Sequence, residues 1–157
     1  MANLENNYNV SIVTQNVDDL HERAGSSKVI HLHGELLKAR STINDRLVYL
    51  REKDIIIGDH CELNSQLRPH IVWFGEAVPM LDTAIQITTQ ADILIIIGTS
   101  MQVYPAASLV NYVYKNTPIY FIDPKPSVSQ HNFNNLTIIP EKATTGVQYL
   151  VNQFLNG

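Results

Sequence analysis

Short apolar runs alternate with segments of helical periodicity through the second half of the chain, and this alternation limits the folds it can adopt. The run at residues 93–97 (ILIII) is apolar at every position, which is typical of a central parallel strand covered on both faces. Residues 71–74, 119–122 and 136–139 form further runs of strand character. Because helical spacing separates these runs, we predict βαβ units, and therefore an α/β fold with a parallel sheet and right-handed crossovers.

The segments between these runs place apolar residues on one helical face. A helix is predicted from Leu81 onward, and Pro105 can open the next helix at its first turn. The inward face of that second helix would be Leu109, Val110 and Val113. A closing helix is marked by the stripe Val147, Leu150, Val151 and Phe154. Nearer the N-terminus, residues 10–14 predict a strand, 18–24 a helix, and 29–33 a second extended run.

Residues 35–67 break this pattern. The segment holds five of the eleven Lys and Arg residues and shows no clean period. We predict an inserted subdomain at 35–67, within a domain formed by residues 1–34 and 68–157.

Composition and charge exclude several classes of protein. With 45% hydrophobic and 17% charged residues among 157, the chain should bury a core. A net charge of -4 argues against binding to nucleic acid or anionic lipid. No apolar run approaches the roughly 18 residues of a membrane span. The single cysteine, Cys61, excludes an internal disulfide, and a cytoplasmic setting is expected.

Polar residues gather directly after the predicted strands. In an open parallel sheet, ligands bind at the carboxyl ends of the strands, so these residues are the candidate site. They are Gln15, Asn16, Asp18, His33, Gly34, Gly75, Glu76, Gly98, Thr99, Ser100 and Asp123. Small, amide and acidic groups of this kind suit hydroxyls, amides and phosphate oxygens.

Residues 98–100 and Asp123 also have a purely structural interpretation. Residues 98–100 could cradle a phosphate or ribose, or form an ordinary turn between strand and helix. Asp123 could accept the hydroxyls of a ribose, or serve as a turn residue ahead of Pro124.

Two histidines share one face of a predicted strand. His31 and His33 flank one residue, which could indicate a metal pair, but no third ligand is evident and packing is the better interpretation. His33 could alternatively act as a general base, since imidazole titrates near neutral pH. Cys61 and His60 make a poor nucleophilic pair, because adjacent residues of an extended segment point to opposite faces.

Trp73 and Phe74 lie in the run at 71–74. Core packing is the ordinary interpretation for at least one of them. The alternative is that the edge of this run pairs with an extended peptide while an aromatic ring lines a channel for a side chain.

Five motifs occur in one order and cover nearly the whole chain. They are TQNVDDLHERAGS (14–26), HLHGEL (31–36), LRPHIVWFGE (67–76), GTSMQVYPAASL (98–109) and IYFID (119–123). Together they resemble the second half of a sirtuin, the family of NAD-dependent protein lysine deacylases, in its bacterial form. The resemblance implies a Rossmann-like parallel sheet and a reaction that moves an acyl group from lysine to ADP-ribose with release of nicotinamide.

The resemblance also implies roles for individual residues. His33 matches the catalytic histidine of the family. Gln15, Asn16 and Asp18 match the segment that lines the nicotinamide and ribose end of the NAD pocket. Asn16 and Asp18 would have a catalytic role, because they would orient the nicotinamide amide and a water molecule. Gly98, Thr99 and Ser100 match the segment that holds the adenosine ribose and the phosphates. Asp123 stands where sirtuins usually carry an asparagine on the adenine ribose. The acyl-lysine peptide would be bound by Val72, Phe74, Gly75 and Glu76.

The sequence departs from the family in its metal ligands. Most sirtuins bind a structural zinc through two pairs of cysteines, whereas residues 35–67 contain only Cys61. We therefore expect no zinc. The inserted segment would be held by its own packing, through Ile43, Leu47, Val48, Tyr49, Leu50 and residues 55–57.

The second departure is that the glycine-rich segment of the family's first half (GAGxSxxSGIPxFR), which binds the pyrophosphate, does not occur. The predicted sheet is therefore incomplete, and we expect self-association or pairing with a missing N-terminal half. Three hypotheses stay open. The first is a deacylase, of which this chain alone could be an inactive fragment. The second is a non-catalytic module that binds a peptide or nucleotide, and the third, less favoured, is a protein ADP-ribosyltransferase.

Overall fold

Three of the predicted apolar runs pair as neighbouring strands in the computed structural model, which describes residues 1–129 and 133–156. In sheet order the strands are β6 (Leu94–Ile97), β7 (Ile119–Ile122) and β8 (Leu136–Ile139). All pairing is parallel, and the register places Ile97 beside Ile122 and Ile122 beside Ile139. The strands therefore end at one edge, and the predicted parallel α/β sheet is confirmed.

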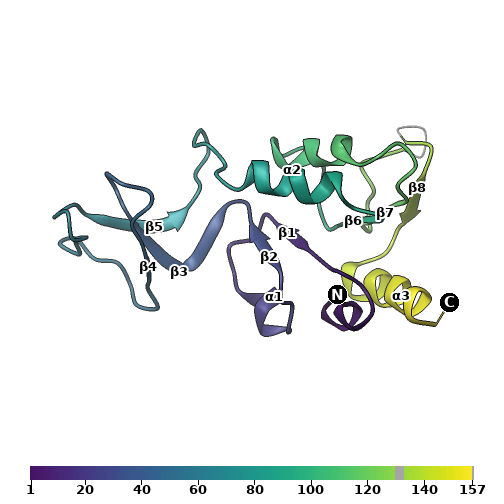
Figure 1. The fold of residues 1–157 in the computed structure, drawn as a ribbon, viewed down its shortest axis with the longest axis horizontal. Helices are drawn as coiled ribbons and strands as arrows, with labels where there is room; N and C mark the ends of the chain where they lie inside the picture. Colours follow the sequence, from purple (N-terminus) through teal and green to yellow (C-terminus); the bar gives the residue numbers. More distant parts are fainter. Residues whose placement is uncertain (130–132, 157) are drawn as a thin grey trace. The chain divides into compact units, whose positions relative to one another are not determined.

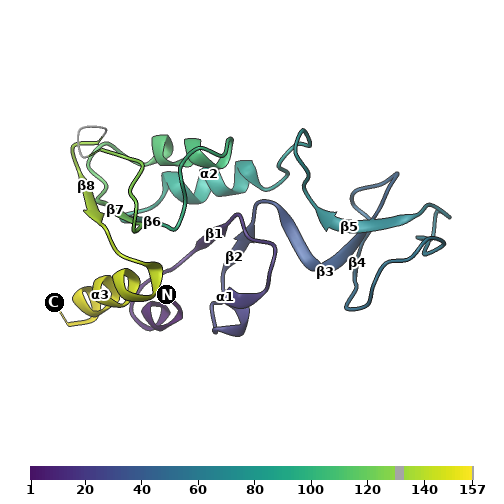
Figure 2. The same cartoon turned by 180° about the vertical axis from the view of Figure 1, so that it is seen from behind.

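Helices lie on both sides of these strands. The elements are η1 (Ala2–Asn6), α2 (Leu81–Thr89), η2 (Ala106–Tyr112) and α3 (Ala143–Asn156), of which η1 and η2 are 3-10 helices. Figures 1 and 2 show α2 on one side of β6 and β7 and α3 on the other. Ile122, Ile139 and Leu150 form a buried cluster against which Val147 and Phe154 pack. The predicted stripe of the closing helix therefore faces the sheet.

Two details differ from the sequence expectation. Among the described strands only β7 pairs with β6, so the ILIII run lies at an edge of its sheet and its residues 94–97 are half-buried. The segment after Pro105 winds as a 3-10 helix and buries Ala106, Ala107 and Val110 rather than Leu109 and Val113. Three residues per turn bring a different set of side chains inward than the α-helical spacing does.

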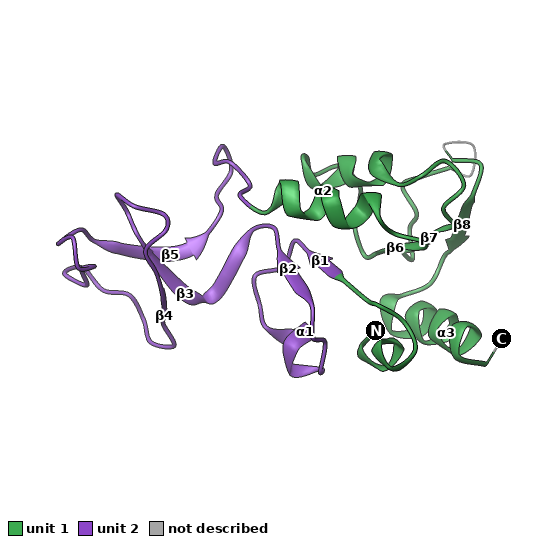
Figure 3. Cartoon of the chain, viewed as in Figure 1, with its two compact units in different colours: residues 1–11, 80–157 green, residues 12–79 purple. Residues whose placement is uncertain are grey.

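Contacts divide the chain into two units, which Figure 3 colours separately. Residues 1–11 and 80–157 form the first unit, which contains the sheet just described, and residues 12–79 form the second. The predicted division at residues 34–35 and 67–68 stays a prediction.

The second unit begins with a small parallel pair. β1 (Ile12–Thr14) pairs with β2 (Val29–His31), and the short helix α1 (Leu20–Arg23) lies between them in sequence. These elements are shorter than the predicted strand, helix and extended run, but they follow the same order.

Residues 35–67 contribute strands to an antiparallel sheet, and long irregular segments connect these strands. β3 (Gly34–Ser41) pairs with both β4 (Val48–Leu50) and β5 (Leu67–Ile71). The predicted strand over residues 71–74 is wrong, because β5 ends at Ile71 and a turn follows.

The predicted packing of the inserted segment is wrong for most of the predicted residues, of which only Leu47, Tyr49 and Ile55 are half-buried. Leu50 and Ile57 are 71% and 98% exposed, and Ile43, Val48 and Ile56 are exposed as well. The buried positions are Ala39, Ser41 and Cys61, whose thiol donates to the Ser41 hydroxyl at 3.3 Å. Small inward residues and that hydrogen bond hold the sheet instead of a large apolar cluster.

Within residues 1–129 and 133–156, no helix is both long enough and apolar enough to cross a membrane.

Candidate active site

The parallel pairing of β1 and β2 brings two histidines against the segment that follows β1. The register sets Thr14 beside His31, and the Leu32 backbone N–H donates to the Thr14 carbonyl at 2.9 Å. One step beyond, the Nδ1 of His31 lies 3.2 Å from the Asn16 carbonyl oxygen, and the Nδ1 of His33 lies 3.0 Å from that of Gln15. Both rings therefore face the same backbone segment.

The hydrogen-bond partner of His33 determines which nitrogen of its neutral ring carries the proton. A carbonyl oxygen can only accept, so Nδ1 of His33 carries the proton and donates to Gln15. In the neutral ring, Nε2 then holds the lone pair, and no residue in the described part of the chain bonds to it. The ring is half-buried. This arrangement can accept a proton at Nε2, which is what a general base requires.

His31 has a different environment. Its Nε2 lies 2.7 Å from a carboxylate oxygen of Glu22 on α1, while Nδ1 faces the Asn16 carbonyl. With an acceptor at both nitrogens, the ring is stabilised in its doubly protonated form. Burial alone lowers the pKa of His31, but the Glu22 and Asn16 hydrogen bonds and the charges of Glu22 and Glu35 together raise it. His31 is thus an anchor between β2, α1 and the residues after β1.

Removing the Glu22 carboxylate should destabilise the protein in a pH-dependent way. The pKa of His31 is raised in the folded protein. Its contribution to the free energy of unfolding is therefore complete below 6.5, the pKa of the unfolded state, and is lost as pH rises through the pKa of the folded state. Burial raises the pKa of Glu22, but its bond to His31 outweighs this, so the contribution of Glu22 is lost only in acid, below 4.5. Urea unfolding should show that Glu22→Gln lowers the free energy of unfolding by up to about 1 kcal/mol at pH ~5.5 and by less at pH ~8.5.

The control for this prediction is Asp19→Asn. Asp19 pairs with Arg23 on the same helix at 3.7 Å and touches no histidine, so its cost should not vary between the two pH values. An equal cost of Glu22→Gln at both pH values would contradict the ion pair.

Gly34 sets the geometry directly after His33. Its φ is +84°, and a Cβ added there would lie 1.9 Å from the carbonyl oxygen of His70 on β5. Backbone cannot move aside as a side chain can, so only glycine allows β3 to start this close to β5.

The residues that follow β5 are bonded to the backbone of His33. The Val72 N–H donates to the His33 carbonyl at 2.9 Å, and a turn over Trp73–Glu76 is closed by the Glu76 N–H on the Trp73 carbonyl at 3.0 Å. Gly75, with φ +88°, occupies the third position of the turn. The turn leaves Phe74 fully exposed and Trp73 57% exposed, so the core-packing interpretation of these aromatics is wrong. The predicted peptide segment is thereby bonded to the residue that carries the predicted base.

The predicted cofactor residues of the first unit lie at the carboxyl edge of its sheet. Gly98 follows β6 and Asp123 follows β7, and the Gly98 N–H donates to the Ile122 carbonyl at 2.9 Å. The Thr99 hydroxyl accepts from the Met101 N–H at 3.2 Å. The sheet thus brings the predicted ribose and phosphate residues of this unit together.

Two of these residues also have local partners. One carboxylate oxygen of Asp123 accepts from the Lys125 N–H at 2.7 Å, as a turn residue does. The Ser100 carbonyl accepts from the Ser127 hydroxyl at 2.7 Å. The turn interpretation of Asp123 therefore holds for one oxygen, and the second has no bond within the described residues.

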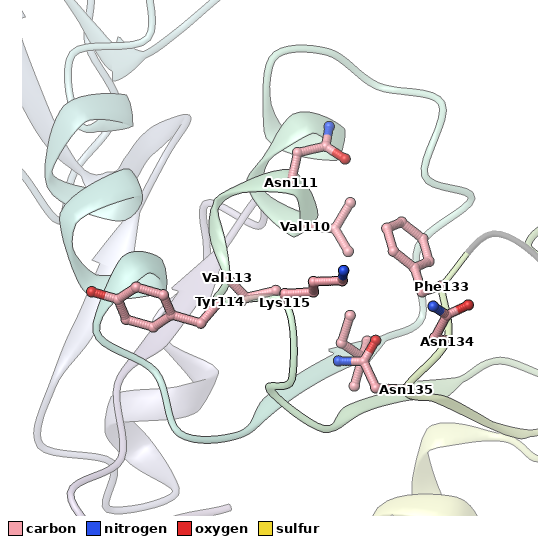
Figure 4. Close-up of a pocket in the computed structure, with 9 residues that line it drawn as sticks. Val110, Asn111, Val113, Tyr114, Lys115, Phe133, Asn134 and Asn135 are labelled. Atoms are coloured by element: carbon pink, nitrogen blue, oxygen red, sulfur yellow. The ribbon is translucent and has the colours of Figure 1, made fainter.

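A pocket of about 240 Å³ lies elsewhere in the first unit (Figure 4). It is lined by Val110, Asn111, Val113, Tyr114, Lys115, Ile119, Phe133, Asn134 and Asn135. Ile119 begins β7, so the pocket is at the end of that strand opposite to Asp123. Lys115 extends toward Phe133 across the opening in Figure 4. No predicted site residue lines this pocket, and it combines one cation with amides and apolar groups, which is no catalytic set.

Sequence reasoning missed three charged residues that hold the site. Glu22 binds His31, and Arg40 and Arg68 bind Glu76. Arg40 and Glu76 are 36 positions apart, so no local spacing marks that pair. In the part of the chain that the structure describes, no three His, Cys, Asp or Glu residues are grouped as a metal site would require.

Comparison with known proteins agrees on one family. The model of the Sir2 family matches residues 1–105. An NAD-dependent protein deacylase of Helicobacter pylori (strain 26695) is 56% identical over 151 residues, covering 96% of this chain and 66% of that protein. One of Bacteroides thetaiotaomicron is 47% identical over 156 residues, covering 96% of this chain and 66% of that protein. This chain therefore spans slightly less than two thirds of the length of these relatives.

Solved structures agree. A Sir2 homologue in complex with NAD superposes with a TM-score of 0.82 at 38% identity, covering 97% of this chain and 61% of that one. A Sir2 protein bound to an acetylated peptide gives 0.77 at 28% identity, covering 99% and 68%. With the family model matching most of its length, the chain belongs to the Sir2 family.

Proposed function

We propose that the intact protein is an NAD-dependent protein lysine deacylase, which transfers an acyl group from lysine to ADP-ribose and releases nicotinamide. The observation that carries this proposal is the hydrogen bond between Nδ1 of His33 and the Gln15 carbonyl. Its Nδ1–H is held by the Gln15 carbonyl, which directs the basic Nε2 away from the backbone, and its own carbonyl holds the first residue of the Val72–Glu76 segment. The names of the relatives support the same activity.

The chemistry follows from where the base stands. NAD would supply a ribose carbon and nicotinamide as the leaving group, so that the acyl oxygen of the peptide would bond to this carbon as its bond to nicotinamide breaks. Nε2 of His33 would take a proton from a ribose hydroxyl, whose oxygen would attack the acyl carbon. Water would then add to the acyl carbon, the bond from this carbon to the lysine nitrogen would break, and lysine would leave as the free amine. Much of the acceleration comes from holding these groups in position.

Asn16 is suited to orient the nicotinamide end. Its backbone is fixed on both sides, since its N–H donates to the Thr14 hydroxyl at 3.1 Å and its carbonyl accepts from His31. Its side chain is left exposed and can turn toward a ligand amide. Asp18, which accepts from the Leu20 N–H at 3.2 Å, and Gln15 complete this group.

The adenosine part of NAD would be held by the first unit. Gly98, Thr99 and Ser100 would face its ribose and phosphates, and the second carboxylate oxygen of Asp123 would accept a ribose hydroxyl. The positive φ of Gly98, +60°, supports a close approach of backbone to ligand there. The substrate peptide would lie along Val72, Phe74, Gly75 and Glu76.

A nicotinamide-release assay with the intact protein separates the three hypotheses. We expect release only when an acyl-lysine peptide is present. Release without peptide, with ADP-ribose found on protein, would instead support an ADP-ribosyltransferase. No release, together with binding of NAD or peptide, would support a non-catalytic module.

The proposed enzyme acts in the cytoplasm on proteins, and not on nucleic acid or membrane surfaces. The chain would associate with itself or with a further segment that supplies the pyrophosphate-binding glycines.

Zinc should not be needed for folding. The inserted sheet is held by backbone pairing and by the Cys61–Ser41 bond, and a zinc site of the family's kind requires four cysteines. Elemental analysis of protein purified without chelator should give far less than one zinc per chain, and EDTA should leave the unfolding midpoint unchanged. One zinc per chain, with loss of stability on its removal, would contradict this expectation.

A further inference from the structure

The Glu76 carboxylate is held by three donors from three places in the second unit. Arg40 of β3 donates to Oε2 at 2.9 Å, Arg68 of β5 donates to Oε1 at 2.6 Å, and the Trp73 N–H donates to Oε2 at 3.1 Å. The Arg68 and Trp73 hydrogen bonds and the two guanidinium charges lower the pKa of Glu76 to about 2. The carboxylate is therefore ionised near neutral pH.

The two arginines depend on this carboxylate in turn. Arg40 and Arg68 stand directly opposite one another in the antiparallel register of β3 and β5. Like charges placed opposite in a sheet repel each other. The Glu76 carboxylate between them offsets this repulsion, so the three side chains form one interdependent group.

The same arginines bond on both sides of the segment Val72–Gly75. Besides Glu76, each approaches the Ile71 carbonyl, Arg40 at 3.5 Å and Arg68 at 3.4 Å. Ile71 is the last residue of β5, and Glu76 is the last residue of the turn. The guanidinium groups therefore bridge the start and the end of the intervening loop.

The loop itself has little else to fix its shape. Val72 is bonded to the His33 carbonyl, but Trp73, Phe74 and Gly75 are exposed. A loop of this kind samples many conformations unless its ends are fixed, and ordering it on binding costs affinity.

We propose that Arg40 and Arg68 are positioning residues that act through Glu76 to hold the loop 72–76 in the shape that pairs with an acylated peptide. This inference rests on the proposed function. It gives the inserted segment, which supplies Arg40, a part in peptide affinity and none in the chemical step.

Steady-state kinetics of Glu76→Gln test the proposal. The amide keeps the shape of the side chain but removes the charge, so the peptide KM should rise about tenfold while kcat and the KM for NAD stay within about twofold. Arg68→Lys keeps the positive charge but loses the planar guanidinium group. Its peptide KM should therefore lie between that of the wild type and that of Arg68→Ala. A merely structural role would change all three kinetic constants together with the folded fraction, which circular dichroism measures.

Trp73 provides a readout that needs no activity. It is the only tryptophan of the chain, and its backbone N–H is one of the three donors to Glu76. In Glu76→Gln its fluorescence should be quenched more readily by acrylamide. This readout distinguishes failure of the proposed function from failure of the positioning role. If quenching of Trp73 increases in Glu76→Gln but the wild type releases no nicotinamide, the proposed function is contradicted. If quenching increases but the peptide KM is unchanged, the positioning role is contradicted.

Arg51→Gln is the matched control. Arg51 also pairs with a carboxylate of the second unit, that of Asp59, and neither residue contacts the loop. Its substitution should alter neither the peptide KM nor the quenching of Trp73. The proposal would be overturned if Arg51→Gln and Glu76→Gln raised the peptide KM equally. It would also be overturned if Glu76→Gln left the quenching of Trp73 unchanged.

Discussion

Replacing His33 by alanine should abolish turnover in the intact protein while leaving NAD binding largely in place. The ring supplies a basic nitrogen, Nε2, and the bond between Nδ1 and the Gln15 carbonyl directs this nitrogen away from the backbone. Loss of a general base costs about 100-fold or more in rate. Nicotinamide release with an acyl-lysine peptide measures the loss, and calorimetric titration with NAD measures the binding.

His60→Ala is the control for this substitution. His60 is exposed on the segment between β4 and β5 and has no part in the proposed chemistry, so its removal should leave the rate unchanged. Retained turnover in His33→Ala would exclude His33 as the base. Loss of NAD binding in the same variant would instead assign the ring a role in holding the nucleotide.

Gly34→Ala should be the most destabilising single substitution of a glycine in the second unit. It would force an alanine into φ +84° and press its Cβ to 1.9 Å from the His70 carbonyl oxygen. Strain and a backbone clash together should cost about 4 kcal/mol or more, enough to unfold a marginal unit. Urea unfolding followed by circular dichroism measures the cost.

Gly58→Ala separates the two causes. Gly58 also has a positive φ, +100°, but nothing lies within 4 Å of an added Cβ. It should therefore cost only the backbone strain of about 1–2 kcal/mol. Equal costs at the two positions would mean that β3 can move away from β5, and the close approach would then not fix the position of His33.

The sequence was most informative for the parallel strands of the first unit. Residues 94–97, 119–122 and 136–139 form strands, because short runs rich in β-branched and apolar residues alternate there with segments of helical spacing. The extent of burial was not predicted, since residues 94–97 are only half-buried. The rule that ligands bind at the carboxyl ends of such strands then selected Gly98 and Asp123, which the register places together.

Sequence reasoning failed where apolar residues are exposed. Trp73 and Phe74 read as a strand but lie in a turn, and Leu50 and Ile57 read as a core but face outward. Composition cannot distinguish an exposed apolar residue from a buried one without knowledge of what it faces.

It also failed for partners distant in sequence. The histidine pair was recognised, but its Glu22 partner was not, and the Arg40–Glu76–Arg68 group joins three separate segments. Charges of this kind look like ordinary surface residues until the sheet brings them into contact. The candidate base could therefore be predicted, whereas the residues that hold its surroundings could not.

The fate of the acyl group tests the central proposal most directly. The intact protein would be incubated with NAD and a peptide carrying an isotopically labelled acyl-lysine, and the products analysed by mass spectrometry. We predict that the label leaves the peptide and appears on ADP-ribose, in step with the nicotinamide released. Nicotinamide release with the label still on lysine, or with ADP-ribose attached to protein, would contradict the account.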